Sequence, residues 1–267
     1  MQIKKERLDI LLVTRGLADT RERAQALIAA GLVSVEGVRR DKCGHAYPPQ
    51  AEITVSAPLK YVSRGGLKLE KAMSAFHIDF TGKFVLDVGA STGGFTDCAL
   101  QHGALGVIAV DVGKGQLAWK LREDKRVTVL EKTNVRYLQK SDLPYLPTMA
   151  TVDVSFISLH LVFPVLNKLL PPGAEVIALI KPQFEAGKEV VSRGEGVVRD
   201  DKVHIAVLEG VLHSAQTLLW GLCGLTFSPL RGPEGNIEFL GWWQLGTLDQ
   251  IAGNAAEVVR AAHNELL

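Results

Sequence analysis

Residues 84–95 read FVLDVGASTGGF, an apolar run that ends at Asp87 and passes into a glycine-rich turn. Glycine adopts positive φ angles without strain and lets the backbone approach a ligand closely. The first N–H groups of the helix that follows have no partner inside that helix, so they remain free to bind one. The segment therefore predicts a strand, a ligand-binding turn and a helix in succession, as at the start of a Rossmann-like domain.

The spacing of the glycines distinguishes between ligands. A dinucleotide site uses G-x-G-x-x-G to hold a pyrophosphate, whereas the glycines here are Gly89, Gly93 and Gly94. The carboxylate of Asp87 would repel a pyrophosphate and suits a ligand with a positively charged amino group, such as the methionine part of S-adenosylmethionine. Asp111 ends the next apolar run, where Rossmann-like folds bind ribose hydroxyls. A tight turn that binds no ligand is the alternative interpretation.

Short apolar runs alternate with helical patterns from residue 83 onward, which predicts an α/β fold with a doubly wound, mostly parallel sheet. The last two strands have no helix between them, so we expect an antiparallel hairpin at one edge of the sheet. The glycine-rich, charged segment 183–199 is expected to be a mobile loop over a site. The predicted strands are residues 84–88, 107–110, 127–130, 150–154, 176–180, 222–228 and 237–245, and the predicted helices are 96–101, 116–122, 159–169 and 203–219.

The first 58 residues have a different pattern, which predicts a small α+β domain. Leu8–Val13 is expected to form a short helix that ends at Gly16, and a second helix is expected to start at Asp19 with Glu22 completing a capping box. Gly31 is expected to end this second helix. Short strands are predicted at 32–35 and 53–55, a linker at 59–65, and the larger α/β domain over 66–267.

Composition narrows the class of protein. The apolar content of 47% is sufficient for a packed core without disulfides, and no apolar run is long enough to span a bilayer. The N-terminus lacks the apolar region of a signal peptide, so we expect a cytoplasmic protein with free cysteines. Residues 1–71 carry a net charge of +5 and the remainder −4, which points to a polyanionic partner for the front of the chain. No metal-binding cluster is expected among the seven histidines.

Two further strand ends carry charged residues, Asp153 after one apolar run and Lys181 after the next. Because the carboxyl ends of parallel strands meet at one edge of a sheet, we expect these side chains to lie together at a ligand site. A lysine at the end of a buried strand is partly desolvated, and desolvation favours the neutral form that acts as a general base. A lysine with only a structural role is the alternative for Lys181 taken alone.

Together these segments resemble the FtsJ-related RNA 2′-O-methyltransferases, and specifically their TlyA branch. The resemblance rests on DVGASTGGF at 87–95, DVSFI at 153–157, KPQFE at 181–185 and YVSRGGLKL at 61–69. It implies a Rossmann-like class I methyltransferase domain with a seven-stranded sheet. RLDILLV at 7–13 and GLVSVEG at 31–37 resemble the small RNA-binding module named after a small-subunit ribosomal protein.

The resemblance implies a catalytic tetrad of Lys68, Asp153, Lys181 and Glu238. In that family Lys181 would take the proton from a ribose 2′-hydroxyl, and Asp153 would orient it. Lys68 and Glu238 would position the nucleotide. The implied cofactor is S-adenosylmethionine, and the implied partner is ribosomal RNA or a ribosomal subunit, with a cytidine ribose as the expected target.

The same resemblance assigns binding roles to further residues. Asp87, Gly89, Ser91, Gly93 and Gly94 would bind the methionine end of the cofactor, Asp111 its ribose, and Asn134 its adenine side. Candidate RNA contacts are Arg15, Arg21, Arg23, Lys42 and Arg64, since basic residues supply sequence-independent affinity for phosphates. Ordinary exposed charge is the alternative for each of them.

Three other functions remain as alternatives. A non-catalytic RNA-binding or ribosome-assembly factor would keep the fold without turnover. A haemolysin is disfavoured because we find no membrane span, no secretion signal and no long amphipathic basic helix. A Rossmann oxidoreductase is disfavoured by the absent G-x-G-x-x-G. We expect a monomer.

Overall fold

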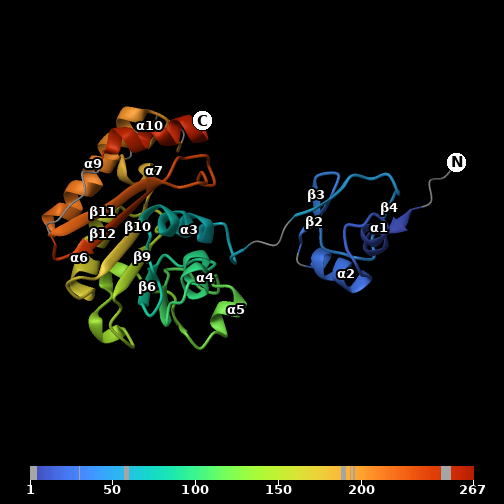
Figure 1. Cartoon of the computed structure of the whole chain (residues 1–267), viewed down its shortest axis with the longest axis horizontal. Helices are drawn as coiled ribbons and strands as arrows, with labels where there is room; N and C mark the ends of the chain where they lie inside the picture. The colour runs from blue at the N-terminus through green and yellow to red at the C-terminus, as the bar shows by residue number, and fades with distance from the viewer. Residues whose placement is uncertain are drawn as a thin grey trace. The chain divides into compact units, whose positions relative to one another are not determined.

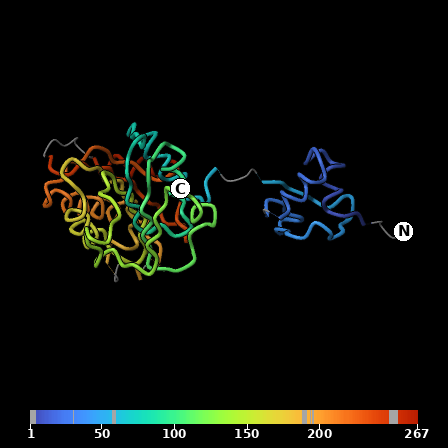
Figure 2. Tube along the Cα trace, turned by 90° about the horizontal axis from the view of Figure 1, so that it is seen from below, coloured from blue at the N-terminus to red at the C-terminus, as the bar shows by residue number. Residues whose placement is uncertain are grey.

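The computed structural model describes residues 5–29, 31–56, 60–187, 191–192, 194, 196–247 and 254–267. Contacts within the chain divide it into two compact units, residues 1–59 and 60–267. Figures 1 and 2 trace the chain through both units, which are described separately below.

The N-terminal unit has two short helices and two small antiparallel sheets. One sheet has the strand order β3-β2-β5, and the other pairs β1 with β4. Leucine and isoleucine side chains at helical spacing, among them Leu8, Leu12 and Ile28, form its buried core. The elements are β1 (Glu6–Arg7), α1 (Leu8–Thr14), α2 (Arg21–Ala29), β2 (Val33–Val35), β3 (Val38–Arg40), β4 (Ala46–Tyr47) and β5 (Ile53–Val55).

The start of α2 differs from the sequence prediction. The hydroxyl of Thr20 accepts a hydrogen bond from the backbone N–H of Arg23 at 3.1 Å, so the helix begins two residues later than predicted and Asp19 is not its cap. The strand β3 was not predicted, because its side chains are mostly exposed and show no alternation of apolar and polar residues. Glu36 and Gly37, both at positive φ, form the tight turn that leads into it.

A buried carboxylate connects the two helices of this unit. Asp9 is fully buried and accepts hydrogen bonds from Arg7 at 3.0 and 2.9 Å, and from Arg21 and Gln25 at 2.9 Å each. The hydrogen bonds from Arg7, with those from Gln25 and Arg21, hold the pKa of Asp9 well below its ordinary value despite its burial. Asp9 is therefore a structural centre of the N-terminal unit.

We expect Asp9→Ala to lower the free energy of unfolding of the N-terminal unit by about 2 kcal/mol at pH 7, since three donors lose their acceptor. Because the folded-state pKa of Asp9 is depressed, its contribution is present above its unfolded pKa and is lost as the pH falls through the folded pKa. Hydrogen exchange of α1 and α2 amides measures the change. The exposed Asp19→Ala is the matched control, and equal protection in both variants would contradict the assignment.

The C-terminal unit, residues 60–267, contains a seven-stranded sheet of order β11-β12-β10-β9-β6-β7-β8. The central strands β7 and β9 are buried along their whole length, as strands covered on both faces are. The predicted antiparallel pair is confirmed, but β12 lies between β10 and β11, so β11 forms the edge. The strands are β6 (Phe84–Val88), β7 (Gly106–Val110), β8 (Val127–Leu130), β9 (Met149–Val152), β10 (Glu175–Ile180), β11 (Trp220–Phe227) and β12 (Phe239–Leu245).

Helices cover both faces of this sheet (Figure 1). One buried cluster lies under α3 and α4, and the other lies under α6, α9 and α10. In α6 the buried side chains Leu159, Val162 and Leu166 recur every three or four residues, as an amphipathic helix requires. The helical segments are α3 (Gly65–Phe76), α4 (Gly94–Gln101), α5 (Trp119–Arg122), η1 (Val135–Tyr137), η2 (Lys140–Asp142), α6 (Leu159–Leu169), α7 (Pro182–Glu185), α9 (Asp201–Thr217) and α10 (Ala255–Leu266).

One expectation about a connecting segment needs revision. Tyr61 is only 2% exposed and packs in the cluster under α3, so residues 60–65 are part of the C-terminal unit instead of a linker. The predicted mobile loop at 183–199 begins with the helix α7, while residues 188–190, 193 and 195 lie outside the described residues. Helices α3 and α10 were not predicted.

Candidate active site

The sheet register brings three of the predicted catalytic residues to one edge. Val152 pairs with Val88 and with Ala178 in parallel, so Asp153 and Lys181 follow neighbouring strand ends. Phe239 pairs with Ile180 in the antiparallel strand β12, so Glu238 enters the sheet at that same edge. The strand order therefore creates this cluster from residues that are far apart in sequence.

Asp153 and Lys181 form one ion pair. The Lys181 Nζ lies 2.6 Å from the Asp153 Oδ1, and it donates a hydrogen bond to the Ser155 hydroxyl at 3.0 Å. The Lys181 side chain is 11% exposed and that of Asp153 is 22% exposed. The amine therefore has one charge partner, Asp153, and one hydrogen-bond acceptor, Ser155, and it lies in the wall of a cavity that all three residues line.

Lys68 and Glu238 form a second, more deeply buried pair. Lys68 projects from α3 and donates to a carboxylate oxygen of Glu238, whose side chain is 1% exposed. Burial raises the pKa of Glu238, although the charge of Lys68 opposes this shift. All four residues line one cavity of about 330 Å³, which is thus the place where the predicted tetrad comes together.

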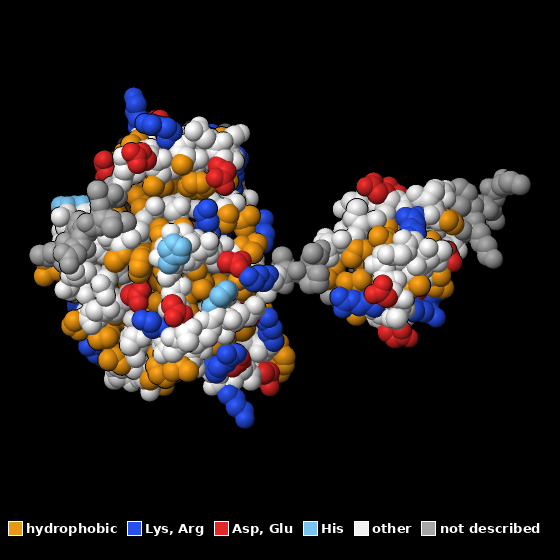
Figure 3. All heavy atoms as spheres, viewed as in Figure 1, with side chains coloured by type: hydrophobic (Ala, Val, Ile, Leu, Met, Phe, Trp, Pro, Cys, Tyr) orange, Lys and Arg blue, Asp and Glu red, His pale blue; other side chains and the backbone are white. Residues whose placement is uncertain are grey.

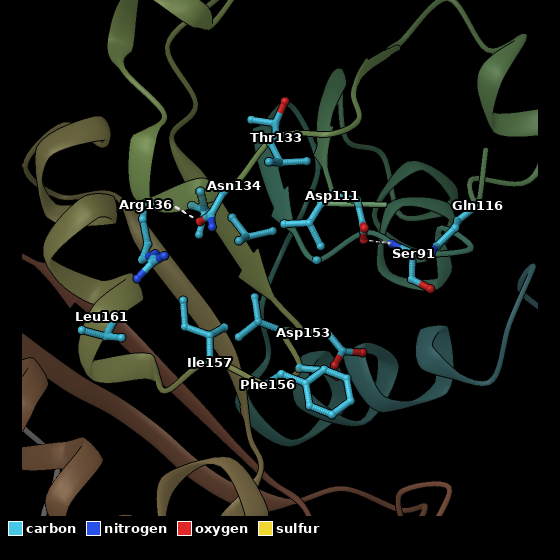
Figure 4. A pocket seen from close by; sticks show the side chains of 17 residues that line it. Ser91, Asp111, Gln116, Thr133, Asn134, Arg136, Asp153, Phe156, Ile157 and Leu161 are labelled. Carbon is cyan, nitrogen blue, oxygen red and sulfur yellow. Dashed lines mark hydrogen bonds between the residues drawn. The ribbon is translucent and has the colours of Figure 1, made fainter. Parts of the chain in front are cut away.

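A second cavity of about 490 Å³ adjoins the first, since Gly89, Ser91, Asp153 and Ser155 line both. Its volume is in the range of small-molecule sites. Figure 4 shows Ser91 and Asp111 on one side of this cavity and Ile157 and Leu161 on the other. Polar groups therefore face an apolar wall, which suits a ligand with a ribose and a flat base.

The glycine-rich turn is shaped by the strands beside it. Gly89 has φ +84°, and a Cβ there would lie 2.5 Å from the backbone carbonyl oxygen of Asp153. Asp111 accepts hydrogen bonds from the backbone N–H groups of Ser91 and Gly113, both at 2.7 Å. Gly89, Ser91 and Asp111 therefore lie in the cavity wall, at the positions that the sequence predicted for ligand contacts.

Three other predicted cofactor residues make buried hydrogen bonds or allow close packing within the protein. Asp87 is fully buried outside both cavity walls, and its oxygens accept from the hydroxyls of Thr96 at 2.6 Å and Thr151 at 2.9 Å. Burial raises the pKa of Asp87 to about 6. Gly93 leaves room for leucine side chains that a Cβ would meet at 2.3 and 2.8 Å. Gly94 allows the close approach of α4 to α3 and also lines the catalytic cavity.

Asn134 lies in the wall of the larger cavity, as the adenine-side prediction requires. Its side-chain oxygen accepts a hydrogen bond from the backbone N–H of Arg136 at 3.0 Å and so caps η1 (Figure 4). Among the described residues its amide nitrogen has no hydrogen-bond partner, so that atom is available to a ligand. The side chain therefore combines a turn role with a position in the cavity wall.

Comparison with known protein families gives matches in both units of the chain. Residues 61–245 match the FtsJ-like methyltransferases, and residues 6–53 match the S4 domain. The chain belongs to the FtsJ-like methyltransferase family. Its seven-stranded sheet and the cofactor expected from the sequence, S-adenosylmethionine, agree with this membership.

Several relatives of this FtsJ-like chain match over most of its length. The chain is 54% identical over 242 residues to a Bacillus subtilis protein named "Putative rRNA methyltransferase YqxC", covering 90% of this chain and 86% of that protein. It is 43% identical to the 16S/23S rRNA (cytidine-2′-O)-methyltransferase TlyA of Mycobacterium tuberculosis, with 91% of each covered. A solved structure titled "Putative hemolysin from Streptococcus thermophilus" matches with TM-score 0.77 and 46% identity, covering 98% of this chain and 97% of that one.

The candidate RNA contacts of the S4 domain divide into two kinds. Arg15 donates to the backbone carbonyls of Pro49 and, at 2.7 Å, Ala51, while Arg21 pairs with Asp9. Arg23 and Lys42 are exposed, and their side chains have no partner among the described residues. In Figure 3 the basic side chains are interspersed with acidic ones over the visible faces of both units. The candidates available for a polyanion in this domain are therefore Arg23 and Lys42.

Sequence reasoning missed three features of the FtsJ-like site. Phe156 is 91% exposed at φ +63° and lies over Phe184 with ring centroids 5.1 Å apart, so it presents an aromatic face at the cofactor cavity. Arg231 and Gly232 lie in the loop before Glu238. The positive φ of Phe156 has no sequence signal, and the loop residues adjoin the site only through the strand order.

No described helix is long and apolar enough to cross a membrane. The described residues also contain no group of three or more potential metal ligands.

Proposed function

We propose that this protein methylates the ribose 2′-hydroxyl of a cytidine in ribosomal RNA with S-adenosylmethionine as methyl donor. The observation that carries the proposal is the cavity in which Lys68, Asp153, Lys181 and Glu238 form two ion pairs beside the cofactor-sized cavity. The relative from Mycobacterium tuberculosis is named for the same reaction. A ribosomal substrate also implies a cytoplasmic protein, and a monomer remains our prediction.

The larger cavity fits the proposed cofactor. Two carboxylates, Asp111 and Asp153, lie in its wall, and they suit a ligand with ribose hydroxyls and a positive charge. Val110, Val135 and Ile157 supply apolar contacts for a base. S-adenosylmethionine, when bound, supplies a methyl group on a positively charged sulfur.

The residues of the smaller cavity would position the RNA ribose and remove the proton from its 2′-hydroxyl. We assign Lys181 as the general base: in its neutral form, its Nζ accepts the 2′-hydroxyl proton beside the Asp153 carboxylate and the Ser155 hydroxyl. Asp153 stabilises the ammonium group that results. Lys68 and Glu238 fix the shape of the cavity and position the ribose, because a held geometry removes much of the cost of bringing reactants together.

The test is transfer of labelled methyl from S-adenosylmethionine to purified small and large ribosomal subunits and to whole ribosomes. We expect label on RNA, at a ribose 2′-oxygen of a cytidine when the product nucleosides are analysed. A protein that binds the cofactor and the subunits tightly but leaves every RNA unlabelled would instead be the assembly factor that the sequence left as an alternative.

We expect Gly232→Ala to lower kcat by about 10- to 100-fold, since small displacements at an active site have effects of this size. A Cβ at this position would lie 2.8 Å from a carboxylate oxygen of Glu238, which is buried and held by Lys68. Gly210→Ala, whose Cβ would meet only a histidine ring at an ordinary 3.9 Å, is the control. Equal turnover of both variants and the wild type would show that Glu238 needs no fixed position.

We expect the double variant Arg23→Ala, Lys42→Ala to reduce the slope of log affinity for ribosomal subunits against log salt by about 1.5, as loss of two phosphate contacts requires. Both side chains are exposed and free among the described residues. A control variant, Lys125→Ala with Arg260→Ala, removes the same charge from exposed positions of the FtsJ-like unit. The same salt slope in both double variants would remove the S4 domain's Arg23 and Lys42 from the RNA contact.

A further inference from the structure

The charges around the catalytic cavity do not cancel. The cavity wall contains four cations and two carboxylates: Arg64, Lys68, Lys181 and Arg231, with Asp153 and Glu238. Lys68 is paired with Glu238 and Lys181 with Asp153, so the tetrad itself is neutral in its ionised state. The excess of two positive charges therefore belongs to the two arginines.

The side chains of both arginines are exposed to solvent. Neither the Arg64 nor the Arg231 guanidinium has an ion pair or a hydrogen bond within the part of the chain that the structure describes. Arg15 and Arg21 in the other unit show the contrast, since their guanidinium groups bind backbone carbonyls and a carboxylate. A free guanidinium beside a polar cavity is available for an external anion.

The backbone that carries each arginine is held in place. In the segment before Arg64, Tyr61 is buried and the N–H of Val62 donates to Asp97 at 2.8 Å. Around Arg231, the Ser228 hydroxyl donates to the carbonyl of Leu230 at 2.6 Å, and the N–H of Gly232 donates to the carbonyl of Asn236 at 2.9 Å. Both side chains are thus attached to braced segments on the rim of one cavity.

We propose that Arg64 and Arg231 bind the two phosphates that flank the reacting ribose, one on each side of it. This proposal rests on the proposed RNA 2′-O-methylation. A ribose that reaches Lys181 brings its 5′ and 3′ phosphodiesters with it, each with one negative charge, and the cavity offers two unpaired positive charges. Guanidinium groups match phosphate oxygens in a bidentate geometry, which fixes the ribose as well as attracting it.

The experiment compares Arg64→Ala, Arg231→Ala, Arg231→Lys and Arg260→Ala as full-length proteins. Arg260 is an exposed arginine of α10 outside both cavities, so its variant controls for loss of charge alone. Affinity for purified ribosomal subunits is measured over a series of salt concentrations. KM and kcat for methyl transfer are measured on the same subunits, and S-adenosylhomocysteine affinity is measured by calorimetry.

We expect Arg64→Ala and Arg231→Ala each to raise KM for the subunits about five- to tenfold and to reduce the salt slope by about 0.7 to 0.9, with cofactor affinity unchanged. Arg231→Lys should keep the salt slope and lose part of the affinity, because lysine keeps the positive charge but lacks the paired N–H donors of a guanidinium group. Arg260→Ala should behave as the wild type.

Two failures can be told apart. If the wild type methylates the subunits while both cavity variants keep its salt slope and KM, the phosphate role is wrong and the methyltransferase function stands. If no protein methylates but the two variants still lose salt slope relative to Arg260→Ala, the phosphate contacts stand and the proposed reaction is wrong. Loss of cofactor affinity in either cavity variant would overturn the proposal in favour of a structural role.

Discussion

Replacing Lys181 by alanine is expected to lower kcat for RNA methylation by about 10²- to 10⁴-fold, the range for loss of a positioned general base. Its Nζ is the amine that Asp153 and Ser155 orient toward the catalytic cavity. Lys181 does not line the larger cavity, so affinity for S-adenosylhomocysteine should remain within about twofold of the wild type. The measurement is single-turnover transfer of labelled methyl to ribosomal subunits, with calorimetry for the cofactor.

Lys125→Ala is the matched control, because it removes an exposed lysine far from both cavity walls. A second variant, Asp153→Asn, keeps the shape of the carboxylate and removes its charge, and should also lower kcat. If Lys181→Ala methylates RNA at a rate near the wild type, the assignment of Lys181 as base is wrong. If it loses cofactor binding to the same degree as turnover, Lys181 has a role in binding instead.

The sequence predicted the part of this site that depends on sheet order. Asp111, Asp153 and Lys181 each follow an apolar run, and parallel strands place such ends at one edge, so their approach needed no structural information. Gly89 was predicted because glycine adopts positive φ and allows a ligand to approach closely, and the structure adds that a Cβ there would meet the Asp153 carbonyl oxygen at 2.5 Å. The alternation of strands and helices predicted the doubly wound sheet, and the missing helix between the last two strands predicted their antiparallel pairing, but neither predicted that β12 lies between β10 and β11.

Other features depend on packing that a pattern does not contain. Asp87 and Asp111 each end an apolar run in the sequence, but Asp87 lies within β6 and its carboxylate is buried between two threonine hydroxyls. The sequence spacing does not distinguish such a buried acid from one in a cavity wall. The role of Lys68 came from the resemblance alone, because α3 begins at the glycine pair Gly65 and Gly66, which gave no sign of a helix start. Arg21 looked like a surface cation, and only the fold shows that it pairs with Asp9.

The second large effect is expected at the buried ion pair. Lys68→Met should lower the free energy of unfolding of the C-terminal unit by about 3 kcal/mol at pH 8. The reason is that the Glu238 carboxylate, whose side chain is only 1% exposed, would remain charged after losing its ion-pair partner. Methionine preserves most of the side-chain volume, so the decrease in the free energy of unfolding reflects removal of the charge and not creation of a cavity. Urea unfolding followed by tryptophan fluorescence measures it, and Lys125→Met is the exposed control.

The pH dependence separates this explanation from simple loss of packing. Burial already raises the pKa of Glu238 above its ordinary value of 4.5, and Lys68 opposes that rise, so removing Lys68 raises the pKa further. A carboxyl group with a raised folded-state pKa binds its proton more tightly in the folded state, so stability increases as the pH falls through that pKa. The deficit of Lys68→Met should therefore shrink from pH 8 to pH 5.

A double variant completes the thermodynamic cycle. Adding Glu238→Gln to Lys68→Met removes the charge that was left unpaired, so the double variant should be more stable at pH 8 than Lys68→Met alone, and its stability should depend less on pH. Additive losses in the double variant, or a deficit of Lys68→Met that is the same at pH 5 and pH 8, would mean that Lys68 and Glu238 are not energetically coupled. Coupling between them would instead mean that Lys68 and Glu238 help to maintain the folded cavity, a structural role distinct from the proton transfer that we propose for the more exposed Lys181.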